Sequence, residues 1–156
     1  MPDFWEVLKK RHSTREFDPE KEVEEKKLKK ILEAAKMAPS AGNMRDWHFE
    51  VVKDPTKKTK LGQAALGQMF IAEAPVVIVV CSDLKIAEEH YGERGVNLYA
   101  AQDSAAATEN MFLACTALDL ACAWVGAFDE REVRKVLELP EHIRPLVIMP
   151  VGYART

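Results

Sequence analysis

The chain has 156 residues, of which 47% are hydrophobic and 30% charged, and its formal net charge is -3. This composition is typical of a globular protein, and the length predicts a single domain over residues 1–156. The acidic balance excludes a general nucleic-acid binder, which needs a clustered basic surface. The longest apolar run, Pro75 to Cys81, is too short to cross a membrane, and the N-terminus lacks the apolar stretch of a signal peptide. We therefore expect a cytoplasmic protein with no membrane partner.

Two helices are predicted in the first forty residues. Asp3 can cap the first helix, with Glu6 as its capping-box partner, and this helix should stop near Lys10. Its expected buried stripe consists of Phe4, Val7 and Leu8. The second helix ends at Pro39. Its apolar face is formed by Leu28, Ile31, Leu32 and Ala35.

Two strands follow, with a weak helical pattern between them. Trp47, Phe49 and Val51 alternate with polar residues, which predicts a half-buried strand. The run PVVIVVC is apolar at every position, which indicates a strand buried on both faces and therefore central in its sheet.

The second half of the chain begins with a helical pattern from about 96 to 120 that is crowded with alanine. A helix that is apolar nearly all round must be buried, so we predict a central or dimer-interface helix. After it we expect a strand over 122–125, a turn at Gly126, a helix over 129–137 and a last strand over 146–151. No strand is followed by a glycine-rich Rossmann fingerprint. The pattern favours an α+β fold with a mixed central sheet surrounded by helices.

The cysteines and histidines of the sequence do not indicate a disulfide framework or a metal site. Cys81, Cys115 and Cys122 show no CxxC pairing, so neither a disulfide framework nor a zinc cluster is predicted, and packing thiols are the simpler interpretation. The four histidines are scattered without the helical spacing of a metal motif. We therefore expect no metal.

The segment RHSTREF follows the first helix and carries two arginines and a serine at alternate positions. If the chain is extended there, Arg11, Ser13 and Arg15 share one side, where their donors suit a phosphate group. The alternative is that Lys9, Lys10 and Arg11 only complement the negative end of the helix dipole. In that case Arg15 is a solvated loop residue, and the segment alone favours this second interpretation, because short basic motifs often occur without a functional site.

The loop APSAGN joins the second helix to the Trp-led strand. Gly42 permits a close backbone approach, and Ser40 and Asn43 supply hydrogen-bonding groups beside it. These features suit a planar polar ligand. An ordinary helix-to-strand turn would use the same residue types.

Together these segments resemble the FMN-dependent nitroreductase family, and the resemblance covers nearly the whole chain. It is carried by RHSTREF, by APSAGN with Trp47, by AEAPVVIVV and by the C-terminal stretch WVGAFDEREVRKVLELPEHIRPLVIMPVGY, in that order. The resemblance implies an α+β homodimer with two FMN molecules at the interface.

The resemblance also implies roles for particular residues. FMN would be held by Arg11, His12, Ser13 and Arg15 of one subunit, and by Pro39, Ser40 and Asn43 of the other. Gly126 would place a backbone N–H near the hydride-accepting nitrogen of the flavin, and Gln68 would contact the ring.

The implied function is an FMN-dependent oxidoreductase that transfers reducing equivalents from NAD(P)H to a nitroaromatic or quinone by a ping-pong mechanism. Flavin carries the redox chemistry itself, so no catalytic side chain is expected. Alternatives are another flavin reaction on the same scaffold, such as reductive dehalogenation or flavin cleavage, and a flavin-binding dimer without turnover.

Two features depart from the family pattern. Many relatives have Gln and Pro before the tryptophan, where this chain has Arg45 and Asp46. Arg45 would either add positive charge beside the flavin or form a surface ion pair with Asp46, and the surface pair is the favoured interpretation. Where relatives continue into a tail that can supply a basic residue to the phosphate, this chain offers Arg155.

Overall fold

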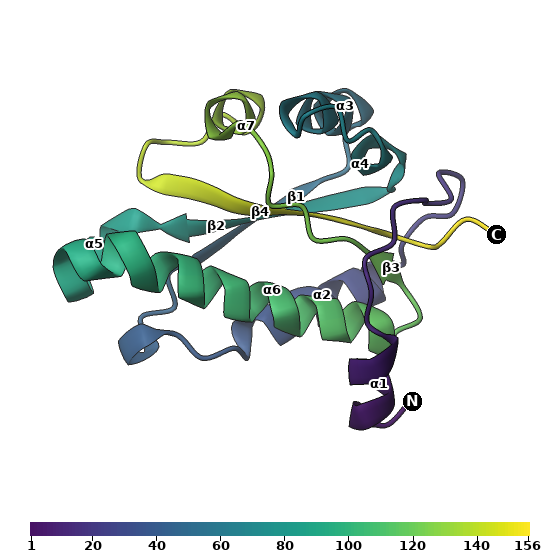
Figure 1. Cartoon of the computed structure of the whole chain (residues 1–156), viewed down its shortest axis with the longest axis horizontal. Helices are drawn as coiled ribbons and strands as arrows, with labels where there is room; N and C mark the ends of the chain where they lie inside the picture. Colours follow the sequence, from purple (N-terminus) through teal and green to yellow (C-terminus); the bar gives the residue numbers. More distant parts are fainter.

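A four-stranded sheet forms the middle layer of the molecule, as the computed structural model of residues 1–156 shows (Figure 1). In the order of their positions in the sheet, the strands are β1 (Trp47–Val52), β2 (Val76–Asp83), β4 (Ile143–Gly152) and β3 (Ala121–Cys122). The α+β fold with helices around a central sheet is confirmed. All three strand pairs are antiparallel, so the expectation of a mixed sheet is wrong.

The strand β2 lies in the interior of the sheet, between β1 and β4, as its sequence predicts. Its alternate residues enter two separate cores. Ile78 and Val80 pack in the core beneath one face of the sheet, and Val77 and Val79 pack in the core beneath the other. Because both faces are covered, the strand has no position left for an exposed polar side chain.

One face of the sheet is covered by α2 (Glu25–Lys36) and α6 (Ala100–Ala117), with α1 (Phe4–Lys10) beside the end of α6 (Figure 1). Leu28 and Ile31 of α2 and Met111 and Phe112 of α6 are buried in the larger core. The small side chains of α6 allow α2 to approach closely, as the alanine-rich sequence indicates.

The opposite face is covered by α3 (Pro55–Ala64), α4 (Phe70–Glu73) and α7 (Glu130–Leu137) (Figure 1). The helix α5 (Leu84–Arg94) and a π-helical turn, η2 (Gly95–Tyr99), connect β2 to α6. A 3-10 turn, η1 (Ala41–Asn43), lies between α2 and β1.

The helix α1 begins and ends where the sequence predicts, and the Asp3 side chain accepts a hydrogen bond from the Glu6 N–H at 3.1 Å. Its predicted buried stripe is wrong in two of three positions. Val7 is buried, but Phe4 is 60% exposed and Leu8 is 40% exposed. The cause is that the main packing partner of α1 is α6, so much of its apolar surface stays exposed.

Other element boundaries differ by a few residues. The long helix α6 spans Ala100–Ala117 instead of 96–120, because η2 precedes it and Asp119 adopts a left-handed φ of 57° after it. The strand predicted over 122–125 is reduced to Ala121–Cys122, and Val125 forms an isolated bridge with Ile148.

The three cysteines are free and buried, as expected of packing thiols. Burial raises the pKa of Cys81 to about 12, so its thiol stays protonated at neutral pH. No helix combines the length and the apolar character that crossing a bilayer requires.

Candidate functional site

The segment carrying Arg11, Ser13 and Arg15 runs along β3 and the residues that follow it. The Thr14 N–H donates to the carbonyl of Cys122 at 2.8 Å, and the Ser13 Oγ accepts a hydrogen bond from the Trp124 N–H at 3.3 Å. The Arg11 guanidinium carbon lies 5.2 Å from the centre of the Phe112 ring on α6. These contacts fix residues 11–15, which we call the strap, against the C-terminal half of the chain.

Side chains of this strap alternate between two sides, as an extended chain requires. His12 and Thr14 line a cavity of about 330 Å³. Arg11 and Ser13 instead contact Phe112 and Trp124. Arg15 is exposed, and none of the ion pairs of the chain involves its guanidinium, so it is available to an anion. Lys9 and Lys10 do lie in the last turn of α1, so the helix-dipole role is compatible with the same geometry.

Gln68 contacts Ala127, the residue that follows Gly126. The Gln68 Nε2 donates to the carbonyl of Ala127 at 3.2 Å and to that of Ala65 at 2.8 Å. Gly126 is exposed, and its backbone N–H has no acceptor within the chain, whereas the neighbouring Val125 exchanges two hydrogen bonds of 2.9 Å with Ile148. A continuous row thus leads from Ser13 along residues 124–127 to Gln68.

The loop that carries Pro39, Ser40 and Asn43 lies elsewhere in the chain. The Ala41 N–H donates to Asp103 Oδ1 at 3.0 Å, which ties the loop to the first turns of α6. Ser40 Oγ accepts the Arg45 N–H at 3.0 Å. Pro39 and Asn43 are exposed.

The two predicted halves of the site therefore lie at different ends of α6. The strap contacts Phe112, and the loop contacts Asp103, nine residues earlier, which corresponds to about 14 Å along a helix axis. Figure 1 shows the loop between α2 and β1 at the α5 side of the molecule and the strap at the opposite side, near β3. Within one chain, the structure does not bring the two halves together.

The expected surface pair of Arg45 and Asp46 is wrong. Asp46 is fully buried, and its Oδ2 accepts a hydrogen bond from the Ser82 hydroxyl at 2.8 Å. Arg45 is exposed, with its guanidinium 5.5 Å from the Trp47 ring centre and within 3.4 Å of the Lys36 carbonyl. Arg155, the proposed tail contact, forms an ion pair with Glu73 at 3.1 Å.

Sequence reasoning missed Asp103. It is 6% exposed, and burial, followed by a hydrogen bond with Asp46, raises its pKa to about 7. The one available signal is a lone aspartate among the alanines of a helix predicted to be buried.

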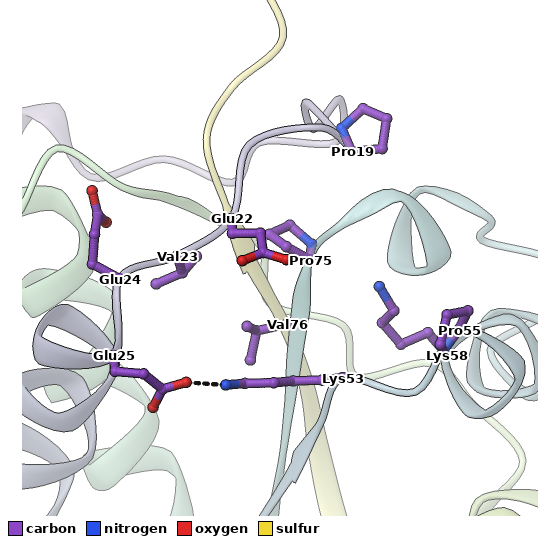
Figure 2. Close-up of a pocket in the computed structure, with 10 residues that line it drawn as sticks. All are labelled: Pro19, Glu22, Val23, Glu24, Glu25, Lys53, Pro55, Lys58, Pro75 and Val76. Atoms are coloured by element: carbon purple, nitrogen blue, oxygen red, sulfur yellow. Dashed lines mark hydrogen bonds and ion pairs between the residues drawn. The ribbon is translucent and has the colours of Figure 1, made fainter.

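The largest cavity of the chain lies away from all of these residues. It has a volume of about 570 Å³ and opens between the start of α2, α3 and the start of β2 (Figure 2). Most of its charged groups have partners: Lys53 pairs with Glu25, and Lys58 donates to the Ala74 carbonyl at 2.8 Å. None of the predicted site residues lines it.

Comparison with known proteins identifies the family of the chain. The model of the nitroreductase family matches residues 8–73 and 66–153. A protein of Archaeoglobus fulgidus named NADH dehydrogenase/NAD(P)H nitroreductase is 34% identical over 159 residues, covering 99% of this chain and 87% of the relative. The crystal structure of a nitroreductase family protein from Clostridium difficile is 32% identical, with a TM-score of 0.86 over 99% of this chain and 86% of that one. An FMN reductase [NAD(P)H] of Bacillus subtilis is 31% identical over 144 residues, covering 84% of this chain and 58% of the relative.

These matches define the class of protein as an oxidoreductase enzyme built on this α+β fold. The chain belongs to the nitroreductase family, whose model spans nearly its whole length.

Proposed function

We propose that the protein is an FMN-dependent oxidoreductase that takes reducing equivalents from NAD(P)H and passes them to an electron-poor acceptor, a nitroaromatic or a quinone. The observation that carries this proposal is the row of unpaired donors along the strap and residues 124–127. It runs from the free guanidinium of Arg15, past Ser13, to the free N–H of Gly126. The relatives named NAD(P)H nitroreductase and FMN reductase support the same cofactor and donor.

In this proposal the strap holds the phosphate of FMN. Arginine donates paired, charge-assisted hydrogen bonds to phosphate oxygens, and Arg11 and Arg15 project from the same side of an extended chain. The Ser13 hydroxyl accepts from Trp124 and keeps its own proton free to donate to the ligand. The His12 side chain points to the opposite side of the strap, where it lines the cavity of about 330 Å³. His12 would therefore contact the cofactor through its backbone.

At the other end of the row, Gly126 and Gln68 would meet the flavin ring. A backbone N–H without an acceptor can donate to a ring nitrogen, and an exposed glycine allows the ring to approach closely. Gln68 is held by two backbone carbonyls, so its carbonyl oxygen is oriented for a contact with the ligand.

The separation of Ser40 and Asn43 from the strap supports a homodimer in which each flavin contacts two subunits. Large apolar side chains that are exposed in the single chain are consistent with such an interface. They include Phe4 at 60%, Trp5 at 69% and Met37 at 78% exposure. A dimer would place the loop of one subunit opposite the strap of its partner.

Bound FMN would supply the hydride chemistry, and the chain would bind and orient it. One pocket would receive the nicotinamide donor first and the acceptor after the donor has left, which is a ping-pong mechanism. Initial rates measured at several fixed acceptor concentrations should give parallel double-reciprocal lines when the donor is varied. Intersecting lines would refute the shared pocket.

The cofactor assignment is tested by titrating FMN into the apoprotein and its Arg15→Ala variant. Loss of charged hydrogen bonds should weaken binding by about 1.5 to 3 kcal/mol, which is roughly tenfold to 100-fold in Kd. Arg131→Ala is the matched control, because Arg131 is equally exposed but lies on α7. Equal FMN affinity for the two variants would show that the strap does not hold the phosphate.

A further inference from the structure

The loop between α2 and β1 is strained. Arg45 has a φ of 51°, in the left-handed region that residues other than glycine and asparagine rarely occupy, and Gly42 and Asn43 before it both have a φ of 54°. Such a backbone persists only where its surroundings hold it in place. The contacts around this loop should therefore include an anchor.

Two side chains form that anchor. Asp103 accepts the Ala41 N–H at 3.0 Å through Oδ1, and its carbonyl accepts the Trp47 indole N–H at 2.9 Å. Asp46 accepts the Ser82 hydroxyl at 2.8 Å, and its carbonyl accepts the Asp83 N–H at 2.7 Å. The aspartates thus bind the beginning and the end of the loop to α6 and to β2.

The two carboxyl groups face one another in a buried site. Asp46 is fully buried and Asp103 is 6% exposed. Asp46 Oδ1 and Asp103 Oδ2 are buried and accept no hydrogen bond from any donor of the chain, and the two side chains are within hydrogen-bonding reach of each other. Two buried carboxylates cannot both ionise cheaply in contact, so one proton between them satisfies both remaining oxygens.

Neither Asp46 nor Asp103 forms an ion pair, and several charged groups around them have partners elsewhere. Arg45 is directed to the Lys36 carbonyl, and the Asp83 carboxylate caps α5. Other groups on neighbouring elements also have partners of their own: His48 pairs with Glu50, Arg94 donates to Tyr99, and Arg144 pairs with Glu130. His90 bonds to the Ile86 carbonyl, and Tyr91 packs edge-on against Tyr99. A second negative charge in the pair would therefore have no paired cation.

We propose that Asp46 and Asp103 share one proton, and that this shared proton holds the Ser40–Asn43 loop in the conformation that meets the flavin. Asp103 is then a positioning residue that acts through the loop. The link to the flavin rests on the proposed function, whereas the link to the loop does not.

We call the loop closed when the two aspartates hold it, and open when it has left them and their carboxyl groups are solvated. The aspartate pair binds its proton more tightly in the closed loop than in the open loop, and this difference sets the direction of the pH dependence. The pKa of Asp103 is about 7 in the closed loop against an ordinary 3.8. Between these values the open loop loses the proton while the closed loop keeps it, so closure weakens as the pH rises from about 4 to about 7. Above that range the closure equilibrium is constant.

Amide hydrogen exchange of peptides covering residues 40–46 tests the anchor in the protein without added flavin. After correction for the intrinsic rate, loop protection in the native chain should fall roughly 30-fold to 100-fold between pH 5 and 7, then level off. Asp103→Asn keeps an oxygen for the Ala41 N–H and donates permanently to Asp46, so its protection should not vary with pH. Asp119→Asn is the control, because Asp119 is exposed and asparagine tolerates its left-handed backbone. This variant should behave like the native chain.

Equal pH dependence in the native chain and Asp103→Asn would overturn the proposal, as would protection in the native chain that does not change with pH. Asp46→Asn gives a second measurement, because its amide can donate to Asp103 while its oxygen accepts from Ser82. It too should abolish the pH dependence. FMN titration over the same range adds a separate readout, in which native affinity falls with rising pH and Asp103→Asn affinity does not. Absence of FMN binding at every pH would refute the proposed function while leaving the exchange result to decide the anchor.

Discussion

Replacing Gly42 with alanine tests whether the strained loop is held against α5. A Cβ at this position would overlap the Tyr91 hydroxyl and lie 3.1 Å from Tyr91 Cζ and 3.2 Å from Cε2. The Tyr91 ring cannot retreat without disturbing its edge-on contact with Tyr99, whose ring centre is 5.0 Å away. Gly42 also has a φ of 54°, which alanine adopts only under strain.

The two effects are similar in size. The left-handed backbone costs alanine about 1 to 2 kcal/mol. Displacing a packed side chain adds about 1 kcal/mol, near the lower end for overpacking, because Tyr91 is 42% exposed and can move partway. The free energy of unfolding should fall by roughly 2 to 3 kcal/mol in total, which for a chain of this length lowers Tm by about 4 to 12 °C.

Urea unfolding followed by tryptophan fluorescence measures the change, with Gly67→Ala as the matched control. Gly67 has a φ of 77°, but no atom lies within 4 Å of the place that a methyl group would occupy, so alanine there meets only the backbone cost. In a Tyr91→Ala background, Gly42→Ala should lose the steric part and cost about 1 kcal/mol less. Equal destabilisation by Gly42→Ala and Gly67→Ala, unchanged by removal of Tyr91, would refute the packing described for this loop.

Three further predictions concern stability. In the native chain, the raised pKa of Asp103 should reduce the free energy of unfolding by a few kcal/mol as the pH rises from about 4 to 7, and urea titrations should show that Asp103→Asn lacks this slope. Phe112→Ala should destabilise by about 3 to 5 kcal/mol, because the ring is 1% exposed in the larger core; a loss below about 1 kcal/mol by the same assay would contradict its burial. Arg144→Met should cost less than about 1 kcal/mol in thermal unfolding, because Arg144 and Glu130 are 38% and 39% exposed; a larger loss would show that the pair is not screened by solvent.

Local patterns predicted the features that depend on neighbours in sequence. The apolar run of β2 indicated a strand covered on both faces, and the alternation of Arg11 and Ser13 with His12 indicated an extended strap. Both depend on the period of two that every strand-like backbone imposes.

Features that depend on distant packing escaped the same reasoning. Asp46 follows an arginine, which suggested a surface pair, but the register of β1 with β2 places it beside Ser82 in the interior. Asp103 becomes buried only because the loop folds over the start of α6. Phe4 and Leu8 have the spacing of a buried stripe, yet both remain exposed, at 60% and 40%.

The distance between the strap and the loop along α6 has a consequence for mixtures of variants. In the proposed dimer, an Arg15→Ala chain supplies a damaged strap and an intact loop, and an Asn43→Ala chain supplies the reverse. A heterodimer of the two unites both defects in one cleft and leaves the other cleft native. When equal amounts of the two variants are dissociated and reassembled at random, half of the dimers are heterodimers. About a quarter of all clefts should then be native, although neither variant alone forms a native cleft.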